Sequence, residues 1–337
     1  SVLWDRGPPR QAGPGHDEAK TAFSTYFSTI NRFKEINEAY LRKMFTDEDI
    51  LSNPYLHKNR STCLHSVGQN FFRINSVLDH GLLSYSRFSQ LDPLFQRNFD
   101  GGNCDKWISV VPTNKMNKNS GASKEFLQQG VVFLFDETDL YYPDEKVNSS
   151  YARSYGLPYT KNGGYSDEQY AFDFIPKEKI IGISLDKKLA DKASWGLQHY
   201  VYDSFNYDLF ERNVMFYLKK LNLIKDGNVP EDIKKLLDDY KRLTEAAEDK
   251  GLLYQDLYAD KMMKVSRIIN IHIGAALSEY YREKLNMPED AIVTIHDALL
   301  YELSISNYDY ERVDDSDNVF YMLTPKVNDK SKKTYVK

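Results

Sequence analysis

The chain has 337 residues, 28% of them charged and 41% hydrophobic, which is the composition of an ordinary folded protein with room for about two domains. The net charge is −5 and its acidic excess lies within residues 191–337, which argues against duplex nucleic acid as the main partner because proteins that grip phosphate backbones usually carry a basic surplus. Two cysteines, Cys63 and Cys104, exclude a disulfide framework and favour a reducing environment, with a single bridge or a reactive thiol as the alternative.

The N-terminal part is predicted to be an arm followed by helices. Residues 1–16 are rich in Pro and Gly, so we expect a flexible arm or a cloning remnant there. Residues 17–50 carry apolar side chains at three- and four-residue spacing from Phe23 to Ile36, which predicts helix. A further helix over 37–44 is expected to end at an acidic turn, 46–49.

A β-rich region is expected to follow, over roughly residues 60–186. Strands are predicted at 61–66, 107–111, 131–135, 169–174 and 180–185, with a helix over 73–80 that ends at Gly81. Residues 136–164 show few regular signals and are expected to form a long, functional or mobile loop. The longest purely apolar run, 131–135, is too short to span a bilayer, so we expect a soluble protein without a membrane span.

Helical periodicity returns in the C-terminal part of the chain. Helices are predicted at 203–223, 231–249 and 254–285, and residues 291–305 and 318–324 are expected to be strands or a short helix followed by a strand. Because helices and strands do not alternate regularly, the sequence predicts an α+β fold. We expect one domain over 17–190 and a mainly helical domain over 191–337 that recognises a target or regulates the first.

Three segments of the β-rich region combine residues that could do chemistry. The first, residues 63–84, is a strand ending in His65, then a helix, then a Gly-Leu turn at Gly81. The second is the strand 107–111, which contains Ser109. In the third, Glu168 opens a strand, and a proline turn leads to a second strand that pairs back on it.

In this order the segments resemble the ADP-ribosyltransferase superfamily, in the branch with His first and Glu last that includes poly-ADP-ribose polymerases and bacterial toxins. The resemblance covers roughly residues 60–186 and implies an ADP-ribosyltransferase-like split β-sheet core that takes NAD as its substrate. It implies a mono-ADP-ribosyltransferase acting on a macromolecular acceptor, with protein favoured by the acidic balance. The residues it assigns are Glu168 as the catalytic carboxylate and His65, Ser66, Ser109, Tyr85 and Arg73 as contacts to NAD.

The expected chemistry suits these residue types. Cleavage of the nicotinamide–ribose bond passes through an oxocarbenium-like transition state, which a carboxylate such as that of Glu168 stabilises. An imidazole hydrogen-bonds ribose hydroxyls, Tyr85 could stack on nicotinamide, and Arg73 could reach the pyrophosphate. Ser166 lies two residues before Glu168, where branches that modify arginine carry Glu or Gln, so arginine is not the expected acceptor.

Other interpretations remain open at this point. The same fold could modify nucleic acid, could act as an NAD glycohydrolase, or could be an interaction module with a decayed site. By fold-level analogy, the setting expected for such a domain is a secreted bacterial effector acting in a host cytoplasm. The sequence leaves open the acceptor and the need for an activating partner protein. It has no H-E-x-x-H motif and predicts no metal site, and the pair His296–Asp297 has no nucleophile motif beside it.

Overall fold

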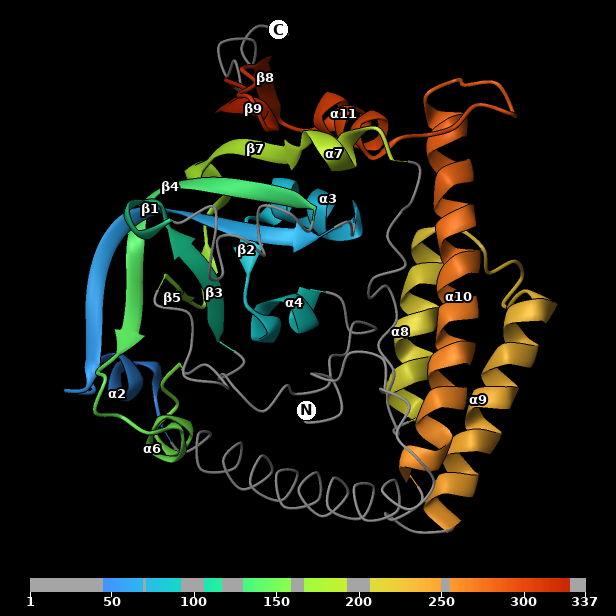
Figure 1. The fold of residues 1–337 in the computed structure, drawn as a ribbon, viewed down its shortest axis with the longest axis horizontal. Helices are drawn as coiled ribbons and strands as arrows, with labels where there is room; N and C mark the ends of the chain where they lie inside the picture. The colour runs from blue at the N-terminus through green and yellow to red at the C-terminus, as the bar shows by residue number, and fades with distance from the viewer. Residues whose placement is uncertain are drawn as a thin grey trace, which may run out of the picture.

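The computed structural model describes residues 45–68, 71–91, 106–116, 130–158, 167–192, 207–249 and 255–327. Within these residues the protein is a mixed α/β structure with a mainly antiparallel sheet and helices packed beside it (Figure 1). The expected α+β class is confirmed to this extent. The predicted arm, the helix over 37–44 and most of the segment 17–50 lie outside the described residues.

The largest sheet has seven strands in the order β1-β3-β5-β4-β7-β9-β8, and each described strand pair is antiparallel. Its strands are β1 (Leu56–Gly68), β3 (Trp107–Pro112), β4 (Val131–Pro143), β5 (Gln169–Phe172), β7 (Ile180–Asp186), β8 (Tyr308–Arg312) and β9 (Asn318–Pro325). Strand β1 also pairs with β4, and β4 meets β5 where Tyr141 lies opposite Tyr170. Strands β1, β3, β5 and β4 therefore close on one another, so the sheet curves strongly at this end.

The prediction of a long loop over 136–164 is wrong for most of that range. Strand β4 continues to Pro143, and α6 (Ser149–Ser154) follows it. The polar second half of β4 pairs with β1 as far as Pro143, and the two strands carry opposite charges there: Arg60 lies opposite Asp139, and Lys58 Nζ is 3.2 Å from an Asp139 carboxylate oxygen. Residues 159–164 lie outside the described residues.

The acidic turn expected at 46–49 is instead the beginning of helix α2 (Asp47–Leu51). The Thr46 hydroxyl accepts a hydrogen bond from the Asp49 N–H, and the Asp49 carboxylate accepts one from the Thr46 N–H. This reciprocal capping satisfies two backbone donors that an open helix end would leave without partners. The acidic residues therefore mark a helix start rather than a turn.

The helix predicted over 73–80 is confirmed as α3 (Phe71–His80), and Gly81 ends it with φ 80°. The chain then forms β2 (Leu82–Leu83), which pairs with β6 (Phe174–Ile175) in a separate two-stranded sheet, and enters α4 (Tyr85–Leu91). The single strand expected over 169–174 is broken at Asp173, whose φ of 67° interrupts the extended backbone between β5 and β6. A short 3-10 turn, η2 (Lys177–Lys179), leads from β6 to β7.

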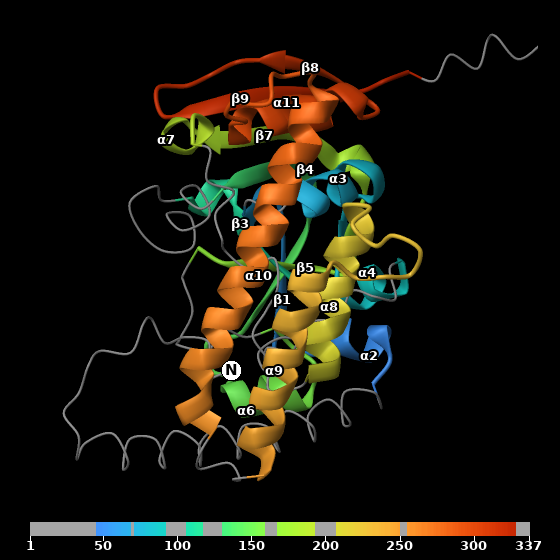
Figure 2. The same ribbon diagram turned by 90° about the vertical axis from the view of Figure 1, so that its right-hand side faces the viewer.

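Three helices lie side by side along one side of the molecule in both Figure 1 and Figure 2. They are α8 (Tyr207–Lys220), α9 (Glu231–Asp249) and α10 (Gln255–Lys284), within the ranges that periodicity predicts. Phe210 of α8 stacks on Tyr240 of α9 with ring centroids 3.6 Å apart, and both side chains are fully buried. The Nδ1 atom of His272 on α10 lies 3.3 Å from the Asp232 carboxylate of α9, so this histidine lies at a helix–helix interface.

The sheet extends past the expected domain boundary at residue 190. Strand β9 pairs with β7, and β8, which the sequence did not predict, pairs with β9. Helix α11 (Ile295–Ile305) contacts α3, α10 and the short helix α7 (Lys187–Ala190). A cut at residue 190 would therefore pass through a shared sheet and a shared core.

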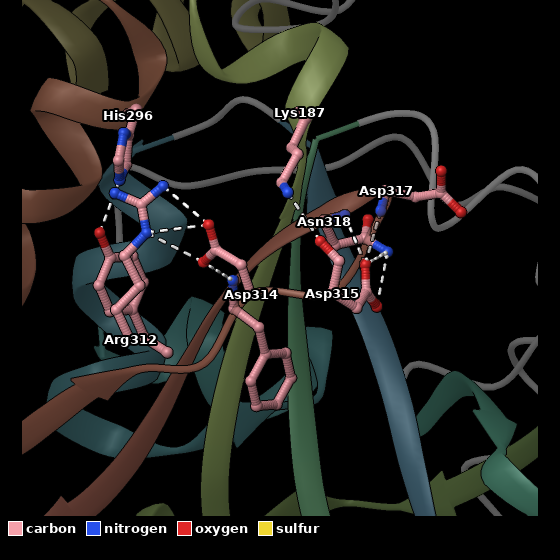
Figure 3. Close-up of polar contacts among 9 residues, drawn as sticks. Lys187, His296, Arg312, Asp314, Asp315, Asp317 and Asn318 are labelled. Carbon is pink, nitrogen blue, oxygen red and sulfur yellow. Dashed lines mark hydrogen bonds and ion pairs between the residues drawn. The ribbon is translucent and has the colours of Figure 1, made fainter.

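The β8–β9 hairpin is fixed by local polar contacts (Figure 3). The Arg312 guanidinium donates to both carboxylate oxygens of Asp314, at 2.8–3.0 Å. The Asp315 carboxylate accepts the backbone N–H groups of Asp317 and Asn318, and Lys187 Nζ donates to the Asp315 carbonyl oxygen at 2.7 Å. The turn is therefore closed by its own acidic residues and by a lysine at the start of α7.

Candidate active site

The structure brings together one residue from each of the three sequence motifs. His65 lies on β1, Ser109 on β3 and Glu168 directly before β5, and β3 is the strand between the other two. His65 Nδ1 lies 2.7 Å from the Ser109 carbonyl oxygen, and the Ser109 hydroxyl donates to Glu168 Oε1. Three neighbouring antiparallel strands thus carry a connected chain of polar groups.

The contact with Ser109 determines which ring nitrogen of His65 carries a proton. A carbonyl oxygen can only accept, so Nδ1 must be the donor at 2.7 Å. In the neutral ring, Nε2 then has the lone pair and can accept a hydrogen bond from a hydroxyl. The side chain is half-buried on a paired strand, so the orientation of the imidazole is held by the sheet.

Glu168 lies at the start of a well-packed strand. It is half-buried, while its neighbours Asp167 and Gln169 are 5% and 2% exposed. The Gln169 side-chain oxygen accepts a hydrogen bond from Asn59 Nδ2 of β1 at 3.2 Å, which fixes the residue next to Glu168 on the opposite side of the strand. The carboxylate is therefore placed by rigid backbone and oriented by the Ser109 hydroxyl.

An aromatic cluster covers the sheet beside these residues. Trp107 lies two residues before Ser109 and Tyr170 two after Glu168, so strand alternation places them on the same face as the site. Trp107 and Tyr170 form a buried cluster with Ala152 and Leu157, two residues of the segment that follows β4. Trp107 Nε1 donates to the Gly156 carbonyl oxygen at 2.6 Å, which fastens this segment to the sheet.

Trp107 is a site-supporting residue that the sequence analysis missed. A tryptophan at the beginning of a predicted strand could have signalled such an anchor, because a buried indole N–H needs an acceptor. Tyrosines of the same segment also contact one another and Tyr55. Tyr151 and Tyr155 have ring centroids 4.3 Å apart, and Tyr55 meets Tyr151 edge-on at 5.4 Å.

The other predicted NAD contacts lie on the elements that follow β1. Ser66 is on β1, where its hydroxyl accepts the Gly68 N–H at 3.2 Å, and Tyr85 is the half-buried first residue of α4. Arg73 of α3 lines a shallow hollow. The other lining residues are Ser76, Val77, Gly81, Leu82, Leu83 and Phe88. The hollow is thus formed by α3, the Gly-Leu turn and α4 rather than by the strands that carry His65, Ser109 and Glu168.

Three other candidates from the sequence are accounted for by burial or by local hydrogen bonds. Cys63 is fully buried, and burial raises the pKa of its thiol to about 12, while Cys104 lies outside the described residues. Asp297 caps α11 through Thr294, and His296 Nε2 lies 2.6 Å from the Tyr321 hydroxyl, so each of the two neighbours has its own hydrogen-bond partner elsewhere. Among the described residues, His, Cys, Asp and Glu side chains form no group of three that could hold a metal ion. The helices in the described ranges include none with the length and apolar character needed to cross a membrane.

Comparison of the chain with protein-family models, with curated proteins and with solved structures finds no match.

Proposed function

We propose that the protein is an NAD-dependent mono-ADP-ribosyltransferase, which cleaves the nicotinamide–ribose bond and passes ADP-ribose to a macromolecular acceptor. The observation that supports this most is the chain of contacts from His65 to Ser109 to Glu168. These residues are separated by 44 and 59 positions in the sequence, yet each touches the next. The resemblance of the three motifs to the ADP-ribosyltransferase superfamily assigns the same residues, with the curved sheet and the β2–β6 pair as the two parts of a split core.

In this proposal, each residue has a distinct role toward NAD. Glu168 supplies a negative charge beside the ribose as positive charge develops in the transition state, an effect that is strong in a half-buried site. The Ser109 hydroxyl holds one oxygen of that carboxylate, and His65 Nε2 accepts a hydrogen bond from a ribose hydroxyl. Arg73 pairs with the pyrophosphate, Ser66 lines the same end of β1, and Tyr85 stacks on nicotinamide.

A protein is the favoured acceptor because the chain has a net charge of −5 and no basic surplus that would suit a phosphate backbone. In this proposal, the segment 149–157, which covers the sheet face beside Glu168, meets the acceptor. A role of the C-terminal helices in target recognition or regulation, an activating partner and a secreted bacterial setting remain predictions.

The test is incubation of the purified protein with NAD labelled in its adenylate part and a cell lysate, comparing wild type with Glu168→Gln. The substituted glutamine keeps the size of the side chain and the hydrogen bond from Ser109 but removes the charge, so transfer should fall by about 100-fold or more. The matched control is Glu178→Gln, which makes the same change at an exposed position in η2 and should retain full activity.

The same experiment separates the alternatives. Nicotinamide release without labelled acceptor would identify an NAD glycohydrolase, and label that survives protease but not nuclease would identify a nucleic-acid acceptor. Equal labelling by wild type and Glu168→Gln would refute the role of Glu168. Absence of both NAD binding and nicotinamide release would refute the whole proposal and leave an interaction module.

A further inference from the structure

A buried carboxylate links the C-terminal helices to the helix that follows the histidine motif. Glu302 on α11 is only 4% exposed, which is rare for an acidic side chain unless it has hydrogen-bond partners. Its Oε1 accepts a hydrogen bond from the Tyr281 hydroxyl of α10 at 2.6 Å, and its Oε2 accepts one from Asn75 Nδ2 of α3 at 3.1 Å. One side chain therefore joins the consecutive helices α10 and α11 to α3, whose Asn75 lies 227 positions before Glu302 in the sequence.

The surroundings of Glu302 are apolar and aromatic. The ring of Tyr281 packs edge-on against Tyr280 and Tyr301, with centroids 5.1 and 5.8 Å away. Burial raises the pKa of the Glu302 carboxyl, and the nearby Asp79 of α3 raises it further, while the two hydrogen bonds act in the opposite direction. In such an environment, a hydrogen bond that is lost is not replaced by water, so the two partners fix the relative positions of the helices more strictly than apolar contacts do.

Opposite faces of α3 contact the hollow and Glu302. Arg73, Ser76 and Val77 face the hollow, at the three- and four-residue spacing of one helix face. Asn75 is two positions after Arg73, which is about 200° around a helix of 3.6 residues per turn. Glu302 therefore holds α3 from the side opposite the hollow.

We propose that Glu302 is a positioning residue for the NAD site, because it fixes α3, and hence Arg73, against α10 and α11. The catalytic consequence rests on the proposed function, whereas the mechanical coupling of α3 to the C-terminal helices does not. The coupling makes the affinity for NAD depend on how α10 and α11 are seated. A change in the position of α10 or α11 would therefore alter the position of Arg73, which is how the C-terminal part of the chain would regulate the site.

The test reverses the polarity of one hydrogen bond. At a pH that ionises both groups, Asn75→Asp places a second negative charge against Glu302 and should push α3 away. Glu302→Gln leaves the Tyr281 contact available, and its effect should be smaller because the Asn75 amide can turn to accept from the substituted glutamine. The double variant Asn75→Asp with Glu302→Gln restores a donor facing an acceptor, and should recover most of what Asn75→Asp loses.

The first readout is hydrogen exchange of the α3 amides, which needs no NAD. We expect about tenfold faster exchange over residues 71–80 in Asn75→Asp and recovery in the double variant, with β4 and β7 unchanged. Glu283→Gln is the matched control, because it makes the same change at an exposed position of α10 two residues from Tyr281. Unchanged exchange in Asn75→Asp, or no recovery in the double variant, would overturn the coupling.

The second readout is the kinetics of nicotinamide release. Asn75→Asp should raise KM for NAD about tenfold with kcat within about twofold of wild type, because Arg73 moves while Glu168 does not. The double variant should return KM to near the wild-type value. A loss of kcat at constant KM would overturn the positioning role. If the wild-type protein neither binds NAD nor releases nicotinamide, the proposed function fails, whereas the exchange experiment still decides whether Glu302 positions α3.

Discussion

Replacing Gly81 with Ala tests how the end of α3 is joined to the small β2–β6 sheet. Gly81 has φ 80°, which costs a residue with a Cβ about 1–2 kcal/mol. A Cβ there would lie 2.3 Å from the Ile175 carbonyl oxygen, 2.7 Å from Lys177 N and 3.0 Å from Pro176 C. These atoms are all backbone, so relief requires the chain at 175–177 to shift, at a cost of about 1–3 kcal/mol.

The expected total is a loss of about 2–5 kcal/mol in the free energy of unfolding, measured by urea denaturation followed by circular dichroism. Gly274→Ala is the matched control, because a Cβ at this position inside α10 meets no atom within 4 Å. Its higher helix propensity should leave the protein equally stable or more stable by up to about 1 kcal/mol. A Gly81→Ala protein within about 0.5 kcal/mol of wild type, or equal losses in both variants, would refute the reasoning.

Three further predictions concern buried polar groups. Trp107→Phe should leave the Gly156 carbonyl without its indole donor, lowering the free energy of unfolding by about 1–3 kcal/mol and speeding proteolysis within 144–158; unchanged proteolysis would contradict the anchor. The free energy of unfolding should fall as pH rises from the unfolded pKa of Glu302, 4.5, to its raised folded pKa, because only the unfolded chain releases the Glu302 proton in that window. In urea titrations at several pH values, Glu302→Gln should lack this fall in the free energy of unfolding. Parallel plots of this free energy against pH for wild type and Glu302→Gln would contradict the prediction. In a Cys104→Ser background, Cys63 should react with a thiol reagent only after unfolding, since burial raises its pKa to about 12, and rapid labelling of the native protein would contradict this.

The sequence motifs could point to three residues that lie in contact, but not to the geometry of their contacts. The order of the motifs pointed to His65, Ser109 and Glu168, and the structure places them in contact. Sequence alone could not indicate that the Ser109 carbonyl, rather than its hydroxyl, holds the imidazole, because strand pairing decides which backbone group faces a neighbouring side chain. The support from Trp107 to Gly156 depends on the path of the chain after β4 and was missed for the same reason.

Local signals determined most of the helices and the strands of the core. The end of α3 at Gly81, the three C-terminal helices and strands such as β3 and β7 follow from hydrophobic period and from residues that suit caps and turns. The second half of β4 and the whole of β8 carry too many charges to read as strands. Their extended form is stabilised by partners elsewhere, such as Arg60 opposite Asp139 and β9 beside β8.

The sequence by itself determined which residue types lie at each motif and where the backbone favours helix or strand, because those preferences come from neighbours within a few positions. Only the tertiary structure decided that the last strands return to the sheet of the first half and that Glu302 contacts Asn75. The physical reason is that long-range pairing depends on the free energy of whole surfaces coming together, which local periodicity does not contain.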